Sequence, residues 1–293
     1  MQGLHLSDQV DDDPCTLVST TWLAAHLNDS DLRLLDASWF LPTDRRNPRA
    51  EFEAAHIPGA RFFDIEAVAD SNAGLPNMAP PPALFASRMR ALGLGDGQQF
   101  VIYDSAGVFS AARAWWMFRM MGKRAVAVLD GGLPKWQAEH RITTATPAPI
   151  RDRHFTVAPD AARTMDVTAV ARASKLGTHT IIDARAPDRF AGAAPEPRPG
   201  LRGGHIPGAI NVYFKDLLQP NGTMKPPAAL RALFDAAGVD LRRPVITTCG
   251  SGVASAVLVL ALERIGVTDH SLYDGSWAEW GMFADLPIAK GQS

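Results

Sequence analysis

The segment PVITTCGSGVASAVLVLALERIG, residues 244–266, decides the fold. It begins with a short apolar, β-branched run, Val245 to Thr248, which predicts a buried strand. Cys249 stands where this run ends, and a Gly-Ser-Gly turn follows it. The apolar residues after the turn are enough for about three turns of helix. This order of strand, loop and helix is typical of an α/β unit.

The position of Cys249 indicates a reactive thiol. In a mainly parallel sheet, ligands bind beyond the carboxyl ends of the strands, and Cys249 falls at such an end. A glycine-containing loop with a helix N-terminus behind it favours the thiolate, which is the nucleophilic form of cysteine. A buried structural cysteine is the alternative reading, because free cysteine is among the most buried residue types. The strand end and the glycine loop together favour the reactive thiol.

The sequence contains one module twice. Four segments recur in the same order, with offsets of 144 to 149 positions. The pairs are LLDAS at 34–38 with IIDAR at 181–185, HIPGA at 56–60 with HIPGA at 205–209, VIYDSAGVFSAA from 101 with ITTCGSGVASAV from 246, and LDGGLPKW at 129–136 with YDGSWAEW at 273–280. A near-constant offset over four segments indicates a tandem duplication of a domain of roughly 130 residues.

Both copies predict the same elements. These are a helix (19–27 and 166–175), a short buried strand (32–36 and 180–183), a second strand after HIPGA (60–63 and 209–212), a further helix, the central strand and helix, a last strand (125–129 and 269–273) and a helix with tryptophan. Strands that alternate with helices predict an α/β fold of two tandem domains, each a mainly parallel sheet with helices on both faces. We place these domains at 15–143 and 165–290, with a linker rich in Pro and Ala at 144–164.

The composition excludes several classes of function. The net charge of −2 gives no reason to expect nucleic acid or an anionic membrane as a partner. The longest apolar run, 254–262, is far shorter than the roughly 20 residues of a membrane span. The acidic segment 1–15 has no apolar core of the kind found in secretory signals. We therefore expect a cytoplasmic protein, and because the duplication already builds a pseudo-dimer, a monomer.

The cysteines exclude further possibilities. Cys15 and Cys249 are the two cysteines of the chain, too few for a disulfide framework or a zinc site by themselves. Neither HIPGA copy has His or Cys partners at metal-ligand spacing, so no metal or cofactor is expected. Cys15 lies in a polar segment, and we interpret it as incidental.

The motifs resemble a known family. The double HIPGA, the CGSGV loop at 249–253 and the YDGSWAEW end are similar to the tandem-rhodanese sulfurtransferases over almost the whole chain. The stretches LDASWFLP, FEAAHIPGARFFDIE, RAWWMFRMMG and EPRPG resemble the branch of this family that uses 3-mercaptopyruvate. The resemblance implies a sulfurtransferase: Cys249 takes sulfur from the donor as a persulfide, pyruvate leaves, and an acceptor removes the sulfur. Thioredoxin, a small thiol and cyanide are the candidate acceptors.

The duplicated loop indicates which copy works. Alignment of the two loops places Asp104 opposite Cys249, and an aspartate cannot carry a transferable sulfur. The first domain is therefore expected to be non-catalytic and to form one wall of an interdomain cleft.

The Cys249 loop favours a donor of low charge. We expect N–H groups from Gly250 to Ser255, including those of Gly252, Val253 and Ala254, to hold the anionic persulfide. Rhodaneses that use thiosulfate resemble this chain but carry an Arg and a Lys directly after the cysteine. Here these places are Gly250 and Ser251, which are neutral.

Two arginines match the substrate-binding pair of the mercaptopyruvate branch. They are Arg189 and Arg198, and the physical reason for arginine is its bidentate fit to a carboxylate. The alternative for each is a solvated surface side chain.

The resemblance also places Ser251 in a proton relay with His56 and Asp44 of the first domain. His56 in a purely structural turn is the alternative, as is Ser251 as a small turn residue, and Asp64 also lies near. The branch usually reads CGSGVT, whereas this chain has Ala254 followed by Ser255, so one hydroxyl of the loop is missing or displaced.

Three other functions are alternatives to this one. A thiosulfate:cyanide sulfurtransferase is the nearest alternative to the mercaptopyruvate enzyme. A rhodanese-like phosphatase needs an arginine six residues after the cysteine, and Ser255 stands there. A non-enzymatic binding module often loses the cysteine, which this chain loses in the first copy alone.

Overall fold

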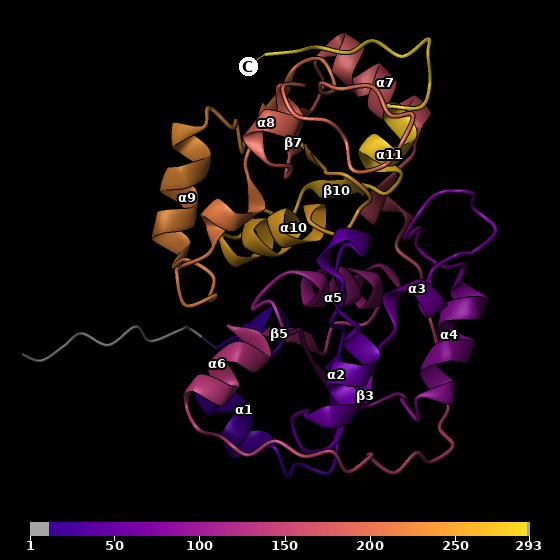
Figure 1. Cartoon of the computed structure of the whole chain (residues 1–293), viewed down its shortest axis with the longest axis vertical. Coiled ribbons are helices and arrows are strands. Elements are labelled where there is room, and N and C mark those ends of the chain that lie inside the picture. The colour runs from indigo at the N-terminus through magenta and orange to yellow at the C-terminus, as the bar shows by residue number, and fades with distance from the viewer. Residues whose placement is uncertain (1–11, 292–293) are drawn as a thin grey trace, which may run out of the picture.

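Two five-stranded sheets, one in each half of the chain, form the frame of the molecule (Figure 1). The structure is a computed structural model and describes residues 12–291. Every neighbouring pair of strands is parallel, in the orders β1-β5-β4-β2-β3 and β6-β10-β9-β7-β8. The strands are β1 (Leu17–Val18), β2 (Leu32–Asp36), β3 (Ala60–Phe62), β4 (Gln99–Tyr103), β5 (Val126–Leu129), β6 (Thr164–Met165), β7 (Thr180–Asp183), β8 (Ala209–Asn211), β9 (Val245–Thr248) and β10 (His270–Tyr273).

This architecture confirms the predicted α/β class with two tandem copies. The sequence analysis missed the edge strands β1 and β6, which pair with the last strand of their own copy through Leu17–Val128 and Thr164–Leu272. Each is two residues long, which is too short to show the alternation that identifies a strand.

Helices cover both faces of each sheet. Ser19 and Asp166 cap corresponding helices in the two copies, because each side chain accepts a hydrogen bond from a backbone N–H of the first turn. The helices are α1 (Thr20–His26), α2 (Pro48–Ala54), α3 (Ile65–Val68), α4 (Pro82–Ala91), α5 (Ser110–Met120), α6 (Gly132–Ala138), α7 (Val167–Leu176), α8 (Pro187–Phe190), α9 (Pro227–Ala236), α10 (Ser255–Arg264) and α11 (Ser276–Trp280), with 3₁₀ turns η1 (Pro42–Asp44), η2 (Ala161–Arg163) and η3 (Phe214–Leu217).

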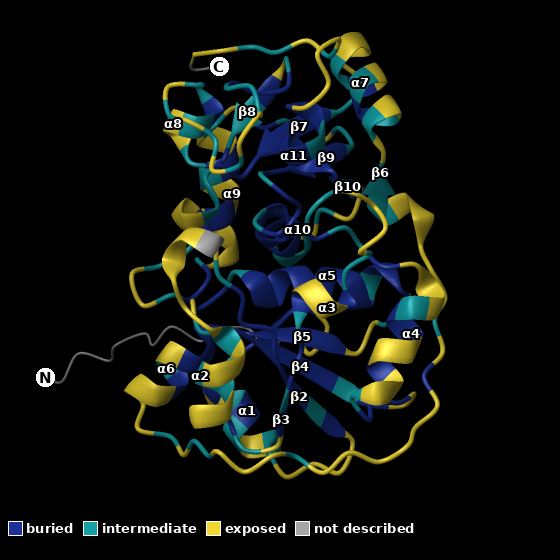
Figure 2. Cartoon of the chain, turned by 45° about the vertical axis from the view of Figure 1, so that its right-hand side comes forward, coloured by how far each residue is buried: buried dark blue, intermediate teal, exposed yellow. Residues whose placement is uncertain are grey.

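The central helices α5 and α10 pack against each other between the two sheets (Figures 1 and 2). One hydrophobic cluster runs through both of them and joins the two halves, whereas each sheet has a separate cluster on its outer face. This explains why the residues after Cys249 are apolar all round, because a helix covered on both sides has no solvent face.

The segment 144–164 is packed on the first copy. Phe155 is buried against Phe85, Phe100 and Phe118, and the backbone of Thr144 pairs with that of His56. Thr164 belongs to β6 rather than to a linker. The proposed boundaries at 15–143, 144–164 and 165–290 otherwise stay a prediction.

Candidate active site

Cys249 lies at the carboxyl end of β9, directly before a loop that leads into α10. Its backbone is anchored on both sides, because its N–H donates to Ser276 Oγ at 3.2 Å and its carbonyl accepts from Trp277 N–H at 2.9 Å. Only 2% of the residue is exposed. The thiol is therefore placed by the sheet and by α11, and it is reached through a pocket rather than from open surface.

The loop after Cys249 has unused hydrogen-bond donors. Within residues 12–291, no N–H group of residues 250–254 donates a hydrogen bond to another group. Gly252 has φ +78°, and a Cβ there would lie 2.9 Å from Asp274 Oδ1, so the turn requires glycine. Free N–H groups in such a turn form a nest that can hold an anion.

The corresponding loop of the first copy surrounds a carboxyl group that accepts hydrogen bonds from its N–H groups. One oxygen of Asp104 accepts from Ala106 N–H, and the other accepts from Phe109 and Ala111 N–H, each at 2.8 Å. Burial raises the pKa of Asp104, and these N–H groups oppose that rise. Because Asp104 occupies the position of Cys249, the same fold can hold a negative group at the head of both loops.

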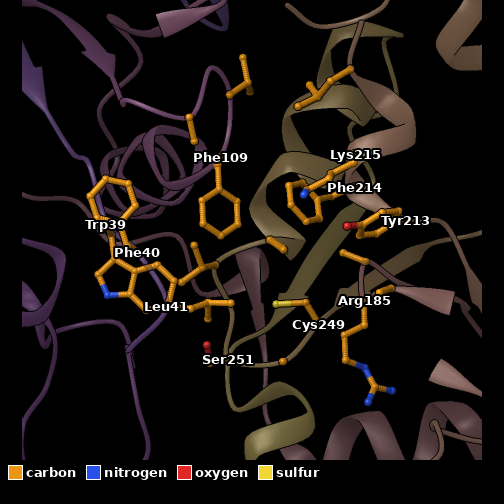
Figure 3. A pocket seen from close by; sticks show the side chains of 18 of the residues that line it. Trp39, Phe40, Leu41, Phe109, Arg185, Tyr213, Phe214, Lys215, Cys249 and Ser251 are labelled. Atoms are coloured by element: carbon orange, nitrogen blue, oxygen red, sulfur yellow. The ribbon is translucent and has the colours of Figure 1, made fainter. Parts of the chain in front are cut away.

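A cavity of about 560 Å³ opens in front of Cys249 and is lined by both halves of the chain (Figure 3). Aromatic side chains of both copies line it, and Phe109 of the first copy stacks on Phe214 of the second at 5.1 Å. Most of its cationic groups belong to the second copy. The aromatic residues are Trp39, Phe40, Phe109, Tyr213 and Phe214, and the cationic ones are Arg185, Arg189, Arg198 and Lys215, with Arg46 at the first copy's side.

Buried Glu196 organises two of these arginines. Its carboxylate pairs with Arg185 at 2.8 Å and with Arg189 at 2.6 Å. Burial would lower the pKa of Arg185, but Asp183 and Glu196 outweigh it and raise that pKa. A Cβ at position 250 would lie 3.1 Å from Arg189 Nη2, so Gly250 makes room for the guanidinium beside the loop.

Arg198 also lines the cavity, and it forms no ion pair within the part of the chain that the structure describes. Partial burial lowers the pKa of Arg198, and a thiolate at Cys249 acts in the opposite direction. Arg198 is thus a cation without a fixed counterion, close enough to Cys249 for their charges to interact.

Ser251 has a different first-copy partner from the one expected. Asn77 Nδ2 donates to Ser251 Oγ at 3.2 Å. The expected partner, His56, is absent from the cavity lining, and its ring nitrogens contact the carbonyls of Phe52 at 2.7 Å and Thr146 at 3.1 Å. These contacts favour the alternative of a structural His56, whose ring contacts the backbone of its own copy, and its part in a proton relay stays a prediction.

The remaining predicted residues are placed as follows. Asp44, Gly250, Val253 and Ala254 line the cavity with Cys249 and Ser251, whereas Gly252 faces Asp274 behind the loop. Asp44 caps its own short turn, since Oδ2 accepts from Leu41 N–H, and no described contact joins it to Ser251. The hydroxyl of Ser255 is buried without a partner among residues 12–291, and Ser255 is absent from the cavity lining.

Several residues of this site escaped the sequence analysis. Glu196 lies within the EPRPG stretch and could have been found as the carboxylate nearest to Arg198. Asn77 and the fully buried Arg113 reach the loop from the first copy, and nothing in their local sequence indicates this.

No group of three or more His, Cys, Asp or Glu residues between 12 and 291 is arranged to hold a metal ion. In the same range, no helix has the length and apolar character to cross a membrane.

Comparison with known proteins gives consistent results. The profile of the rhodanese-like domain matches residues 19–139 and 166–282. The chain is 43% identical over 272 residues to the 3-mercaptopyruvate sulfurtransferase of Escherichia coli K12, covering 92% of this chain and 96% of that protein. It is 39% identical over 298 residues to the mitochondrial thiosulfate/3-mercaptopyruvate sulfurtransferase 1 of Arabidopsis thaliana, covering 94% and 79%. The crystal structure of SseA, a 3-mercaptopyruvate sulfotransferase from Escherichia coli, superposes with a TM-score of 0.82 at 40% identity, covering 89% of this chain and 98% of that one.

Proposed function

Because this chain belongs to the rhodanese family and carries two copies of its domain, we propose that it is a sulfurtransferase that takes sulfur from 3-mercaptopyruvate. The observation that carries this proposal is the cavity itself. It brings the Cys249 thiol, a loop of unused N–H donors and the cationic groups of Arg189 and Arg198 together at the carboxyl end of β9.

The first half-reaction forms a persulfide. The Cys249 thiolate attacks the sulfur of the donor, and the carbon–sulfur bond breaks with its electron pair moving to carbon. The adjacent carbonyl delocalises that charge as an enolate, which takes up the thiol proton and leaves as pyruvate. Cys249 keeps the sulfur as a persulfide, whose charge faces the N–H groups of residues 250–254.

The second half-reaction transfers the sulfur from Cys249 to an acceptor. An acceptor thiolate attacks the outer sulfur, the sulfur–sulfur bond to Cys249 breaks, and the Cys249 thiolate returns. We propose a thiol as acceptor, either a small thiol or that of a protein such as thioredoxin, and cyanide is the alternative.

The charges of the cavity support 3-mercaptopyruvate over thiosulfate. The loop adds no cation next to Cys249, and Glu196 compensates part of the charge of Arg189. The remaining positive charge at Arg198 and Arg189 suits the single carboxylate of 3-mercaptopyruvate. Thiosulfate is a dianion whose charge lies next to the sulfur, and it fits this arrangement less well. The Arabidopsis relative carries both donors in its name, so thiosulfate is the second candidate.

We further propose a cytoplasmic monomer. Two cysteines without a disulfide suit a reducing compartment, and the duplication supplies both walls of the cavity within one chain. Size-exclusion chromatography with light scattering would test the oligomeric state, and fractionation of the source cells would test the location.

The deciding experiment compares kcat/KM for 3-mercaptopyruvate and thiosulfate on one preparation, with cyanide and then a thiol as acceptor. A large preference for 3-mercaptopyruvate is expected. A preference for thiosulfate would reverse the donor assignment, and no turnover of either donor with intact Cys249 would favour a binding module.

A further inference from the structure

The two copies exchange equivalent contacts across their interface. Asp130 Oδ1 of the first copy accepts from Met224 N–H of the second at 2.7 Å. In return, Asp274 Oδ2 of the second copy accepts from Ala79 N–H of the first at 2.7 Å. Asp130 corresponds to Asp274 and Ala79 to Met224 in the duplicated sequence. In each copy this aspartate therefore binds the segment that precedes a helix of the other copy. The two contacts are related by a pseudo-twofold axis.

This symmetry breaks at two positions of the first copy. Arg113 has Leu258 as its counterpart in the second copy, and Asn77 has Gly222. Asn77 and Gly222 both adopt the left-handed backbone region, with φ of 59° and 80°, so the backbone is preserved while the side chain differs. Asparagine is one of the few residues other than glycine that enter this region readily.

Arg113 places a positive charge in contact with the Cys249 loop. It is fully buried, and its guanidinium pairs with Asp274 Oδ1 at 2.7 Å. It donates to the carbonyl of Gly252 at 3.2 Å and to the carbonyl of Asn77 at 2.6 Å. Neither Asp274 Oδ1 nor the second oxygen of Asp130 has a hydrogen-bond partner among the described residues, but Asp274 Oδ1 has the ion pair with Arg113, whereas Asp130 has none there.

These contacts determine how the loop is held. In a trans peptide the C=O and the next N–H point in opposite directions, so a carbonyl of Gly252 bound to Arg113 fixes the direction of Val253 N–H. Asn77, held by the same guanidinium, fixes the side chain of Ser251. A buried ion pair is weak evidence for stability by itself, because its desolvation offsets much of its attraction.

We propose that Arg113, together with Asn77, is the positioning group of the Cys249 loop. The first copy has no nucleophile of its own, but it shapes the cradle in which the Cys249 sulfur carries negative charge. This inference rests on the proposed sulfur transfer for its role in turnover, whereas the effect on the Cys249 thiol itself is independent of any donor.

The chain supplies its own conservative substitutions. Arg113→Leu introduces the residue that the second copy has at the equivalent position, Leu258. Asn77→Gly does the same with Gly222, and glycine favours the same left-handed backbone region. Leu258→Met serves as the matched control at the symmetric position. All variants are made on Cys15→Ser, so that Cys249 is the single thiol. For each, kcat and KM for 3-mercaptopyruvate, the rate of Cys249 alkylation by iodoacetamide, and the melting temperature are measured.

Arg113→Leu is expected to lower kcat by about 10- to 100-fold with KM changed less than about threefold, because misplacement of reacting groups costs up to about 100-fold. Alkylation should slow as well, and Asn77→Gly should show the same pattern more weakly at unchanged melting temperature. Normal kcat and alkylation in Asn77→Gly and in folded Arg113→Leu, or a change confined to melting temperature or KM, would overturn the proposal. If neither the natural protein nor the Cys15→Ser parent transfers sulfur, the proposed function fails, and the alkylation rates alone decide the role of Arg113.

Discussion

Replacement of Gly250 by alanine tests how the loop and the carboxylate site are connected. The new Cβ would lie 3.1 Å from Arg189 Nη2, which is a few tenths of an ångström closer than an ordinary contact. A shift of the Arg189 guanidinium also disturbs its ion pair with Glu196, because the same Nη2 lies 2.6 Å from the Glu196 carboxylate. The backbone of Gly250 lies outside the left-handed region, so alanine adds contact without backbone strain. The substitution therefore acts on the position of Arg189.

The expected loss follows from the interaction that Arg189 makes with a donor carboxylate. A hydrogen bond to a charged group contributes about 1.5–3 kcal/mol. A displaced guanidinium that loses one such bond lowers kcat/KM for 3-mercaptopyruvate by roughly 10- to 150-fold. Mercaptoacetone, which has a methyl group in place of the carboxylate, makes no such bond and should lose less than about threefold.

Steady-state rates with both donors and one acceptor give the measurement. Gly203→Ala is the matched control, because its Cβ would meet Gly192 at an ordinary 3.4 Å and Gly203 lies outside the cavity lining. An equal loss for the two donors would refute the reasoning, since it would show that the methyl group disturbs the sulfur-binding loop rather than the carboxylate site. An unchanged rate with 3-mercaptopyruvate would show that Arg189 does not bind the carboxylate.

Three further predictions concern the remaining groups. Cys249→Ser should abolish sulfur transfer, whereas Cys15→Ser should retain it. Partial burial and Asp13 raise the pKa of the Cys15 thiol, which disfavours its nucleophilic thiolate form. Loss of transfer in Cys15→Ser would contradict the site assignment. Burial raises the pKa of Asp130 from 3.8 to about 6, so its contribution to stability is largest below pH 4 and is lost as the pH rises through 6. The free energy of unfolding of Asp130→Asn should therefore exceed that of the natural protein by up to about 3 kcal/mol at pH 8 and differ little near pH 4. Urea titrations measure this difference, and an equal difference at both pH values would show that the Asp130 pKa is not its cause. Asp104→Ala leaves three N–H groups without their acceptor, of which that of Ala111 is in a buried hydrogen bond, and this should cost roughly 1–3 kcal/mol of unfolding free energy while kcat per folded molecule stays within about twofold; a large fall in kcat would mean that the first loop takes part in the reaction.

The fold was predictable because its signal is local and repeated. The apolar run 245–248 and the break at Cys249 predicted a strand, a loop and a buried helix, and the structure has β9 and α10 there. The offsets between the copies then predicted two similar sheets. What escaped were contacts between distant segments. Asn77 and Ser251 are 174 positions apart, and no periodicity or motif connects them.

The position of His56 away from the cavity lining has a physical explanation that the duplication itself provides. His56 stacks on Phe52 at 4.2 Å and contacts its carbonyl through Nδ1. His205, the counterpart in the second copy, stacks on Phe190 at 3.7 Å and contacts that carbonyl in the same way. A histidine that makes the same contacts in both copies serves the shared turn, whichever loop carries the nucleophile.

The same comparison separates structure from chemistry elsewhere in the chain. Asp130 and Asp274 perform one task in both copies, which is to accept an N–H of the opposite copy. Cys249 and Arg113 have no equivalents in their counterparts Asp104 and Leu258, and Arg113 contacts the loop that Cys249 begins. After a duplication, pressure to keep the fold acts on both copies, whereas pressure to keep one reaction acts on the groups around one loop. Residues that differ between the copies and converge on Cys249 are therefore where further determinants of the reaction should be sought.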